Sequence, residues 1–224
     1  MAVLLLCGCG QKSETAAAAP AQAVIAPAAQ SGMARPVSTG VAPEQFGAKG
    51  DGIADDLQAL QAAMQQASAS GRPLELTAGA VYRFSSCLGL PSGLTIRGNG
   101  AVLLSDIQYP DLKEDRVAVE LMKDSDDDRA HDVRLENVTF RAADSCQANY
   151  MLRVMLARNV EFVGCTFDCE PNEWGRCAAD LYGGNENIRF EGCVFRQMTS
   201  GVSGGIWVRN WTDRVESRNI RFQN

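Results

Sequence analysis

A short pattern of apolar residues recurs along the C-terminal half of the chain. Eight-residue segments that begin at Val133, Val160 and Ile188 match position by position, and their first residues are 27 and then 28 residues apart. A fourth copy begins at Ile220. Periods of about 20 to 50 residues with short apolar strands are typical of solenoids, in which each unit buries its apolar face by stacking on its neighbours. The repeat therefore predicts a stack of coils.

Each copy of the repeat has apolar residues at its first, third, sixth and eighth positions, with Asn or Gly between the two pairs. This alternation places the apolar side chains on one face, so we expect two short strands that meet at a bend and line a core. The sixth position is Val138 in one copy and Cys165 and Cys193 in the next two. We expect both cysteines to be buried thiols that behave as small hydrophobes.

Polar residues recur in register with the apolar ones. An Asp or Asn precedes each copy, and these residue types tolerate the backbone of a tight turn. They predict a column of turn residues stacked about 4.8 Å apart, made of Asp132, Asn159, Asn187 and Asn219. The second position carries charge, and its side chains are expected to pair between neighbouring coils on a solvated surface. They are Arg134, Glu161, Arg189 and Arg221.

A turn and a helix are predicted ahead of the repeats. Residues 46–56 read Phe-Gly-Ala-Lys-Gly-Asp-Gly-Ile-Ala-Asp-Asp, in which Asp51 and Gly52 are a strong signal for a tight turn. Asp55 is suited to cap a helix, and Gln58 three residues later completes a capping pair. The helix is expected to bury one apolar stripe, made of Leu57, Leu60, Met64 and Ala67.

This order of motifs resembles the N-terminus of the pectate lyase superfamily. The resemblance runs from Phe46 to about Leu103, where the turn and helix are followed by Leu74–Tyr82 and Leu90–Gly100. It implies an all-β fold, a right-handed parallel β-helix whose open end is closed by an N-terminal capping α-helix. It also implies that the carboxylates around the turn and the helix start are structural. These are Asp51, Asp55 and Asp56.

Two segments are expected to precede the folded domain. Residues 1–9 end in Leu-Cys-Gly-Cys, which resembles a bacterial lipobox with Cys9 as the lipidated residue, although the basic and apolar parts of a signal peptide are short. The alternative is an apolar start without function. Residues 10–43 are rich in Ala, Pro, Gln and Ser, which predicts a disordered tether. The β-helix domain is then expected to span residues 44–224 and to be truncated inside a repeat.

The composition limits the partners and the location of the protein. The formal net charge is −6 and Lys and Arg do not cluster, which argues against binding to nucleic acid or to an anionic membrane surface. No apolar run approaches the roughly 20 residues of a membrane-spanning helix, so a lipid anchor is the expected membrane contact. Lipidation implies the bacterial cell envelope, at the outer membrane or the periplasmic face, and the alternative is secretion.

Metal binding has weak support in the sequence. His131 is the single histidine, which disfavours a histidine-based metal site and a Ser-His-Asp triad. The acidic run at residues 124–128 fits either a Ca²⁺ site or a solvated loop, because Ca²⁺ prefers carboxylate oxygens. No other metal site or cofactor is expected.

The segment 168–182 holds the best candidate site. It combines acids, a cation and aromatic side chains, and aromatic faces suit stacking on sugar rings. The alternative is a surface loop with ordinary polar residues. The candidate catalytic carboxylates are Asp168, Glu170 and Asp180. The candidate stacking residues are Trp174, Tyr182 and Trp207.

Cys169 and Cys177 flank the loop of this candidate site. Export would place them in an oxidising compartment, where disulfides form and persist. We therefore predict a disulfide between them that closes the loop. Cys87 and Cys146 have no assignment.

The resemblance implies an exported carbohydrate-active enzyme, either a polysaccharide lyase or a glycoside hydrolase, whose partner is an acidic or plant-type polysaccharide. A hydrolase needs two carboxylates about 5–5.5 Å or 6.5–9.5 Å apart, whereas a lyase needs a base and a cation that stabilises an enolate. Polygalacturonase motifs such as Asn-Thr-Asp and Gly-His-Gly are absent, so no catalytic residue is carried over. The alternative function is a non-catalytic glycan-binding or adhesion β-helix, similar to a tailspike shaft.

Overall fold

The structure of the chain is a computed structural model that describes residues 40–108, 116–122, 128–169, 177–196, 205–209 and 216–224. All of these residues belong to one compact unit, Val37–Asn224. Cys9 and nearly all of the predicted tether lie outside the described residues. No helix in the described part of the chain combines the length and apolarity of a membrane span.

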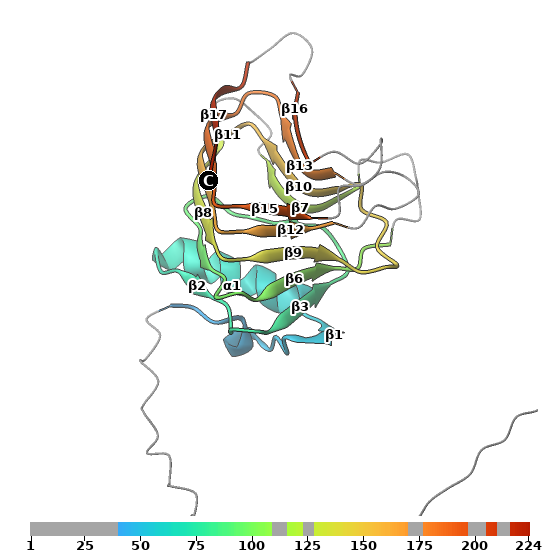
Figure 1. Ribbon diagram of the computed structural model, residues 1–224. Coiled ribbons are helices and arrows are strands. Elements are labelled where there is room, and N and C mark those ends of the chain that lie inside the picture. The colour runs from blue at the N-terminus through green and yellow to red at the C-terminus, as the bar shows by residue number, and fades with distance from the viewer. Residues whose placement is uncertain (1–39, 109–115, 123–127, 170–176, 197–204, 210–215) are drawn as a thin grey trace, which may run out of the picture. The chain divides into compact units, whose positions relative to one another are not determined.

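The described strands form three parallel sheets, which we name A, B and C (Figure 1). Sheet A consists of β2 (Leu74–Glu75), β5 (Thr95–Arg97), β8 (Ala130–Glu136), β11 (Ala157–Val163), β14 (Glu186–Glu191) and β17 (Arg218–Gln223). Sheet B consists of β1 (Asp51–Asp55), β3 (Val81–Phe84), β6 (Val102–Ser105), β9 (Thr139–Ala142), β12 (Thr166–Asp168) and β15 (Val194–Arg196). Sheet C consists of β4 (Leu88–Gly89), β7 (Val117–Met122), β10 (Tyr150–Met155), β13 (Cys177–Tyr182) and β16 (Ile206–Arg209).

The chain visits the three sheets in turn. Strand β10 of sheet C is followed by β11 of sheet A and β12 of sheet B, and the next coil repeats this order with β13, β14 and β15. Each strand pairs in parallel with its equivalent one coil away, so that Val160 faces Val133 on one side and Ile188 on the other. The predicted right-handed parallel β-helix is therefore confirmed, because consecutive parallel strands joined through other sheets wind in the right-handed sense.

Stacked phenylalanines fill the core between sheets A and B. One column, with ring centroids 4.9 Å apart at both steps, consists of Phe140, Phe167 and Phe195. The other column, with steps of 4.7 and 5.3 Å, consists of Phe162, Phe190 and Phe222. A buried ring contributes about 1.5 to 3 kcal/mol through apolar burial, and aromatic pairing adds about 0.5 to 1.5 kcal/mol. The predicted assignment of the third and eighth repeat positions to the core is confirmed for the first two copies and for Phe190, whereas Phe195 is partly buried and Phe222 is 51% exposed.

The predicted column of turn residues is also present. Its four backbones are left-handed, with φ between 54° and 56°. Each Asn donates a hydrogen bond from Nδ2 to the Oδ1 of the column residue one coil earlier. These bonds join Asn159 to Asp132 at 2.9 Å, Asn187 to Asn159 at 3.0 Å and Asn219 to Asn187 at 2.6 Å. The column therefore supplies the positive φ of the bend and satisfies its own side-chain amides.

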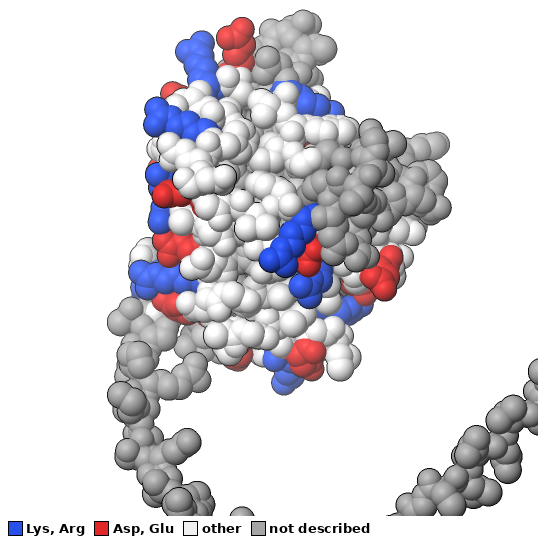
Figure 2. All heavy atoms as spheres, in the orientation of Figure 1, with Lys and Arg blue, Asp and Glu red and all other residues white. Residues whose placement is uncertain are grey.

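Charges at the second repeat position pair between coils, as predicted. Glu161 accepts a hydrogen bond from Arg134, and its Oε1 lies 3.3 Å from Nη2 of Arg189. Glu75 and Arg97 make the equivalent contact at 2.9 Å nearer the N-terminus. Figure 2 shows acidic and basic side chains alternating along the edge of the molecule that carries sheet A. Because these side chains are partly exposed, each pair contributes about 0–1 kcal/mol.

Helix α1 (Leu57–Ser70) lies at the N-terminal end of the stack, where it contacts β2 and β4 (Figure 1). All four residues of the predicted apolar stripe are buried, together with Ala59 and Ala63. The helix ends at Gly71, whose φ of 63° suits a residue without a Cβ. The prediction of an N-terminal capping helix is therefore confirmed.

The start of α1 differs by one residue from the prediction. Its N-cap residue is Asp56 and not Asp55. The Asp56 carboxylate accepts backbone hydrogen bonds from Lys49 at 2.7 Å and Gly50 at 3.0 Å, so it fixes the preceding loop. Asp55 ends β1 and accepts a bond from the Leu57 N–H at 3.2 Å. Both carboxylates are structural, as the resemblance implied.

The packed unit begins before residue 44. Val41 is buried, its N–H donates to the Pro73 carbonyl, and its carbonyl accepts from the Glu75 N–H, both at 2.8 Å. A short 3-10 helix, η1 (Pro43–Phe46), follows. Residues from Gly40 onward are therefore part of the folded domain, and the prediction that residues 40–43 belong to the tether was wrong.

Candidate functional site

A carboxylate lies between two arginines on the outer face of sheet C. Asp180 stands between Ala179 and Leu181, which are both in the core, so strand alternation directs its side chain to the opposite face of β13. Arg153 Nε donates a hydrogen bond to Asp180 Oδ2 at 3.2 Å. Arg209 donates from Nε to Oδ1 at 2.8 Å and from Nη2 to Oδ2 at 2.6 Å. We call Arg153, Asp180 and Arg209 the arginine clamp.

The three side chains of the arginine clamp differ in exposure. The side chain of Asp180 has no exposed surface and that of Arg153 is 8% exposed, whereas that of Arg209 is 36% exposed. The hydrogen bonds and the charge of Asp180 raise the pKa of Arg209, so its guanidinium remains a cation. The clamp therefore presents one oriented positive charge to solvent.

Aromatic rings surround both guanidinium groups. The Cζ atom of Arg209 lies 4.8 Å from the ring centroid of Tyr182 and 5.5 Å from that of Trp207. The Cζ atom of Arg153 lies 4.7 Å from the ring centroid of Tyr150. Such cation–π contacts contribute about 0.5 to 2 kcal/mol each, depending on desolvation. Trp207 is 38% exposed, so one aromatic surface faces solvent beside the Arg209 cation.

The register between neighbouring coils of sheet C brings the residues of this site together. Glu120, Arg153, Asp180 and Trp207 occupy paired positions on β7, β10, β13 and β16. One coil before Arg153, Glu120 Oε2 accepts a hydrogen bond from the Cys87 thiol at 3.5 Å. Burial and the Glu120 charge raise the pKa of Cys87 to about 12, so this thiol is not an activated nucleophile at neutral pH.

The contacts of Asp180 suit a positioning role. A general acid or base must reach the proton that it transfers. Asp180 is fully buried, and both of its oxygens accept hydrogen bonds from guanidinium groups. It therefore orients Arg153 and Arg209, and Arg209 is the residue that can meet an anionic ligand. The catalytic role that the sequence suggested for Asp180 stays a prediction.

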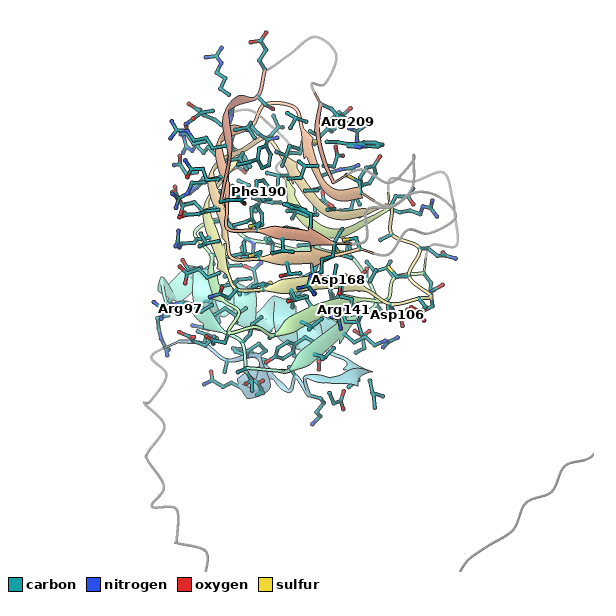
Figure 3. All side chains as sticks on the ribbon, in the orientation of Figure 1. Arg97, Asp106, Arg141, Asp168, Phe190 and Arg209 are labelled. Atoms are coloured by element: carbon teal, nitrogen blue, oxygen red, sulfur yellow. The ribbon has the colours of Figure 1, made fainter. Side chains whose placement is uncertain are left out.

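The other candidate residues lie in different parts of the fold. Asp168 lies on β12 in sheet B, where its Oδ2 is 3.2 Å from Nη2 of Arg141 (Figure 3). It is thus on a different sheet from Asp180. Tyr182 and Trp207 both lie beside Arg209, and their role as stacking residues stays a prediction. Glu170 and Trp174 lie outside the described residues.

The predicted loop disulfide is not formed in the structure, where Cys169 and Cys177 are both buried thiols. The sulfur of Cys177 instead donates a hydrogen bond to the Ala179 carbonyl at 3.1 Å. Burial raises the pKa of Cys177 to about 11. The thiol is therefore held as a neutral donor at the start of β13.

The acidic run 124–128 is described only at Asp128, so the candidate Ca²⁺ site lies almost entirely outside the described residues. Within the described ranges, no group of three or more His, Cys, Asp or Glu side chains is placed to hold a metal ion. Calcium binding by this run stays a prediction.

Sequence reasoning missed Arg153, Arg209 and Tyr150. The available signal was a charged residue inside an apolar strand: Arg153 interrupts Tyr150–Met155 and Asp180 interrupts Cys177–Tyr182, with a spacing of 27 residues. This spacing equals the repeat period, so aligning the strands of sheet C as well as those of sheet A places the two opposite charges side by side.

Several solved structures share this fold at low sequence identity. ORF18 of Geobacillus virus E2 aligns with a TM-score of 0.62 and 18% identity over 82% of this chain and 35% of that chain. The Streptococcus pneumoniae surface protein and adhesin PfbA aligns with a TM-score of 0.60 and 16% identity over 83% of this chain and 61% of that chain. The catalytic unit of a GH87 alpha-1,3-glucanase from Streptomyces thermodiastaticus aligns with a TM-score of 0.51 and 14% identity over 84% of this chain and 35% of that chain.

The chain thus spans less than two thirds of each of these structures, and the likeness shows the fold alone. No curated protein matches the chain. A family model described as "Rhamnogalacturonase A/epimerase, pectate lyase-like" matches residues 41–224, which include all the described strands and α1. The chain therefore belongs to the pectate lyase-like family of rhamnogalacturonase A and epimerases.

Proposed function

We propose that the protein is an exported carbohydrate-active enzyme that binds an acidic polysaccharide on the outer face of sheet C. The observation that carries this proposal is the arginine clamp, which holds Arg209 as an oriented cation beside the exposed ring of Trp207. A guanidinium forms bidentate hydrogen bonds with a carboxylate, and an aromatic ring stacks on the apolar face of a sugar. Together the two groups match one uronic acid residue.

Of the two reactions considered, elimination by a polysaccharide lyase fits this face better than hydrolysis. A lyase removes the proton next to the uronate carboxylate, and a cation stabilises the enolate that forms. Arg209 is suited to supply that cation. Hydrolysis needs two carboxylates that flank the scissile bond. Asp180, a described carboxylate at the centre of this face, is engaged by two arginines instead.

Product analysis on polygalacturonate and alginate, with and without calcium, tests this function. A lyase produces unsaturated sugars, which are followed by their ultraviolet absorbance. We expect Arg209→Ala to lower kcat/KM by about 10- to 100-fold, because a hydrogen bond to a charged group contributes about 1.5 to 3 kcal/mol. Arg221→Ala removes an arginine from sheet A and should leave kcat/KM unchanged. New reducing ends without absorbance would indicate a hydrolase.

A second function is non-catalytic binding of a glycan. The described part of the sheet C face holds aromatic rings and a cation, and its carboxylates at Asp180 and Glu120 accept hydrogen bonds from the two arginines and from the Cys87 thiol. A cation beside aromatic rings is sufficient to bind an acidic glycan without a reaction. Polysaccharide binding that is lost in Trp207→Ala, with no product on any polysaccharide of a broad panel, would favour this function over the lyase.

A further inference from the structure

Two cysteines occupy equivalent positions on neighbouring coils. Cys165 lies in the bend between β11 and β12, and Cys193 lies in the bend between β14 and β15. The residues that follow them, Thr166 and Val194, are paired in the parallel register of sheet B. The two cysteines are therefore direct neighbours along the stack.

The backbone spacing at this pair suits a covalent bond between the coils. The Val194 N–H donates to the Cys165 carbonyl at 2.9 Å, and the Thr166 N–H makes the same bond to Val138 one coil earlier. Neighbouring parallel strands lie about 4.8 Å apart, and disulfides join Cα atoms about 4.4 to 6.8 Å apart. The Cα spacing between neighbouring coils therefore lies within the range that a disulfide joins.

The two sulfur atoms also have matching surroundings. Cys165 Sγ lies 3.5 Å from the Leu135 carbonyl, and Cys193 Sγ lies 3.3 Å from the Phe162 carbonyl. Leu135 and Phe162 are equivalent positions of successive repeats, so both side chains point the same way. Cys165 is fully buried, as predicted, whereas Cys193 is only partly buried, so the prediction of a buried thiol was wrong for Cys193.

The two thiols differ in reactivity. The hydrogen bond with Cys165 lowers the pKa of Cys193 to about 7. The same bond, together with burial, raises the pKa of Cys165. Because the thiolate is the nucleophile in thiol–disulfide exchange, Cys193, whose pKa is lowered, is the thiol that reacts first.

We propose that Cys165 and Cys193 form a disulfide that joins two neighbouring coils when the protein meets a small-molecule disulfide oxidant, RSSR. The Cys193 thiolate attacks one sulfur of RSSR, which forms a mixed disulfide and releases RS⁻. Cys165 then loses its proton and attacks the Cys193 sulfur, which releases the second RS⁻. The two protein thiols give up two protons and two electrons, and the oxidant leaves as two RSH molecules.

This disulfide would join the same two coils that carry the buried half of the arginine clamp. Cys165 belongs to the coil of Arg153, and Cys193 belongs to the coil of Asp180. The bond lies at the bend between sheets A and B, whereas the clamp lies on sheet C. Oxidation would therefore restrain the clamp without entering the proposed binding face.

Peptide mapping of the purified full-length chain after treatment with oxidised glutathione tests the proposal. Trypsin produces a peptide 190–196 that contains Cys193 and a peptide 159–176 that contains Cys165 and Cys169. After alkylation of the remaining thiols, we expect a disulfide-linked pair of these two peptides. The linked pair should persist in Cys169→Ser and disappear in Cys165→Val.

Valine is a matched substitution at this site, because Val138 is the native residue at the equivalent position of the preceding repeat. Oxidation should raise the Tm of the wild type by roughly 5 to 10 °C and leave that of Cys165→Val unchanged. A glutathione adduct on Cys193 without the cross-link, a cross-link through Cys169 or Cys146, or the absence of any reaction would each overturn the proposal.

Discussion

Asp180 is the residue that holds the arginine clamp together. Asn has the same shape without the charge, so Asp180→Asn would remove the negative charge that orients Arg153 and Arg209. We expect the free energy of unfolding to fall by about 3 to 5 kcal/mol, the usual cost of breaking a buried ion pair by removing one partner. Urea denaturation monitored by circular dichroism measures this change.

Asp168→Asn is the matched control for that substitution. Asp168 pairs with Arg141, whose side chain is 47% exposed. Its loss should cost about 1 kcal/mol or less, because solvent screens an exposed ion pair. Equal losses in the two variants would show that the burial of the clamp does not contribute to stability.

Asp106 links stability to pH at the level of a single side chain. A hydrogen bond from Ser145, followed by contacts with Arg83 at 2.7 Å, lowers the pKa of the Asp106 carboxyl. Its folded-state pKa is thus below the unfolded value of about 3.9. Asp106 therefore stabilises the fold above about pH 4, and this contribution is lost as the pH falls through the folded-state pKa.

Asp106→Asn removes this linkage. We expect the difference in unfolding free energy between wild type and Asp106→Asn to be constant from about pH 7 to pH 5 and to shrink below about pH 4. Urea titrations at several pH values measure the difference. If it stayed constant down to pH 3, the interactions of Asp106 would not favour its charged form.

Among the elements of the fold, the column of turn residues is the one that depends most on side-chain identity. Asn159 has a φ of 55° and bonds to Asp132 and Asn187. A left-handed backbone costs an alanine about 1 to 2 kcal/mol, and each lost hydrogen bond about 0.5 to 1.5 kcal/mol. We expect Asn159→Ala to lower the free energy of unfolding by about 2 to 4 kcal/mol in a urea titration.

Asn159→Gly separates the backbone part of this effect from the side-chain part. Glycine adopts positive φ without a steric penalty but makes neither hydrogen bond. The free energy of unfolding should therefore fall in Asn159→Gly by about half as much as in Asn159→Ala. Equal losses would mean that the left-handed backbone places no demand on residue 159.

The elements of the β-helix could be predicted because short-range patterns encode them. The apolar repeat positions and the Asp and Asn residues before them define strands and bends within a few residues of each other. The start of α1 was wrong by one residue because Asp55 and Asp56 are both suited to a cap, and the loop at Lys49 and Gly50 decides between them. Such a contact is invisible to a local pattern.

The candidate site could be predicted only in part for the same reason. Asp180, Tyr182 and Trp207 were found by residue type, but Arg153 and Arg209 act through a partner one coil away. Their roles depend on the register between coils of sheet C, which has no apolar repeat as clear as that of sheet A. The sequence analysis therefore found the carboxylate and the aromatic residues of the sheet C face and missed the two arginines that bind the carboxylate.

At the scale of the whole molecule, the candidate site exists because coils stack on one another. Each coil of a solenoid contacts its immediate neighbours, so a site arises where side chains from successive coils meet. Arg153, Asp180 and Arg209 come from β10, β13 and β16, which are three successive strands of sheet C. Loss of stacking at any of these coils would therefore disturb the clamp before the remaining coils unfold.

Attachment to a membrane is a property of the whole molecule that we expect from its N-terminal sequence. A lipid on Cys9, followed by a tether of about 30 residues at 10–39, would hold the β-helix roughly 30 Å from the membrane on average. Such a distance would let a polysaccharide reach the face of sheet C. Lipidation at Cys9 would also confirm the export that the proposed function requires.

Metabolic labelling with palmitate in a bacterial host tests this anchor. We expect wild type to incorporate the label and Cys9→Ala to lose it, because the thiol of residue 9 is the expected acceptor. Cys7→Ala is the matched control and should keep the label, since Cys7 is preceded by Leu6, whereas Cys9 is preceded by the small residue Gly8. Equal labelling of Cys9→Ala and wild type would place the lipid elsewhere or exclude it, and the protein would then reach its polysaccharide without this anchor.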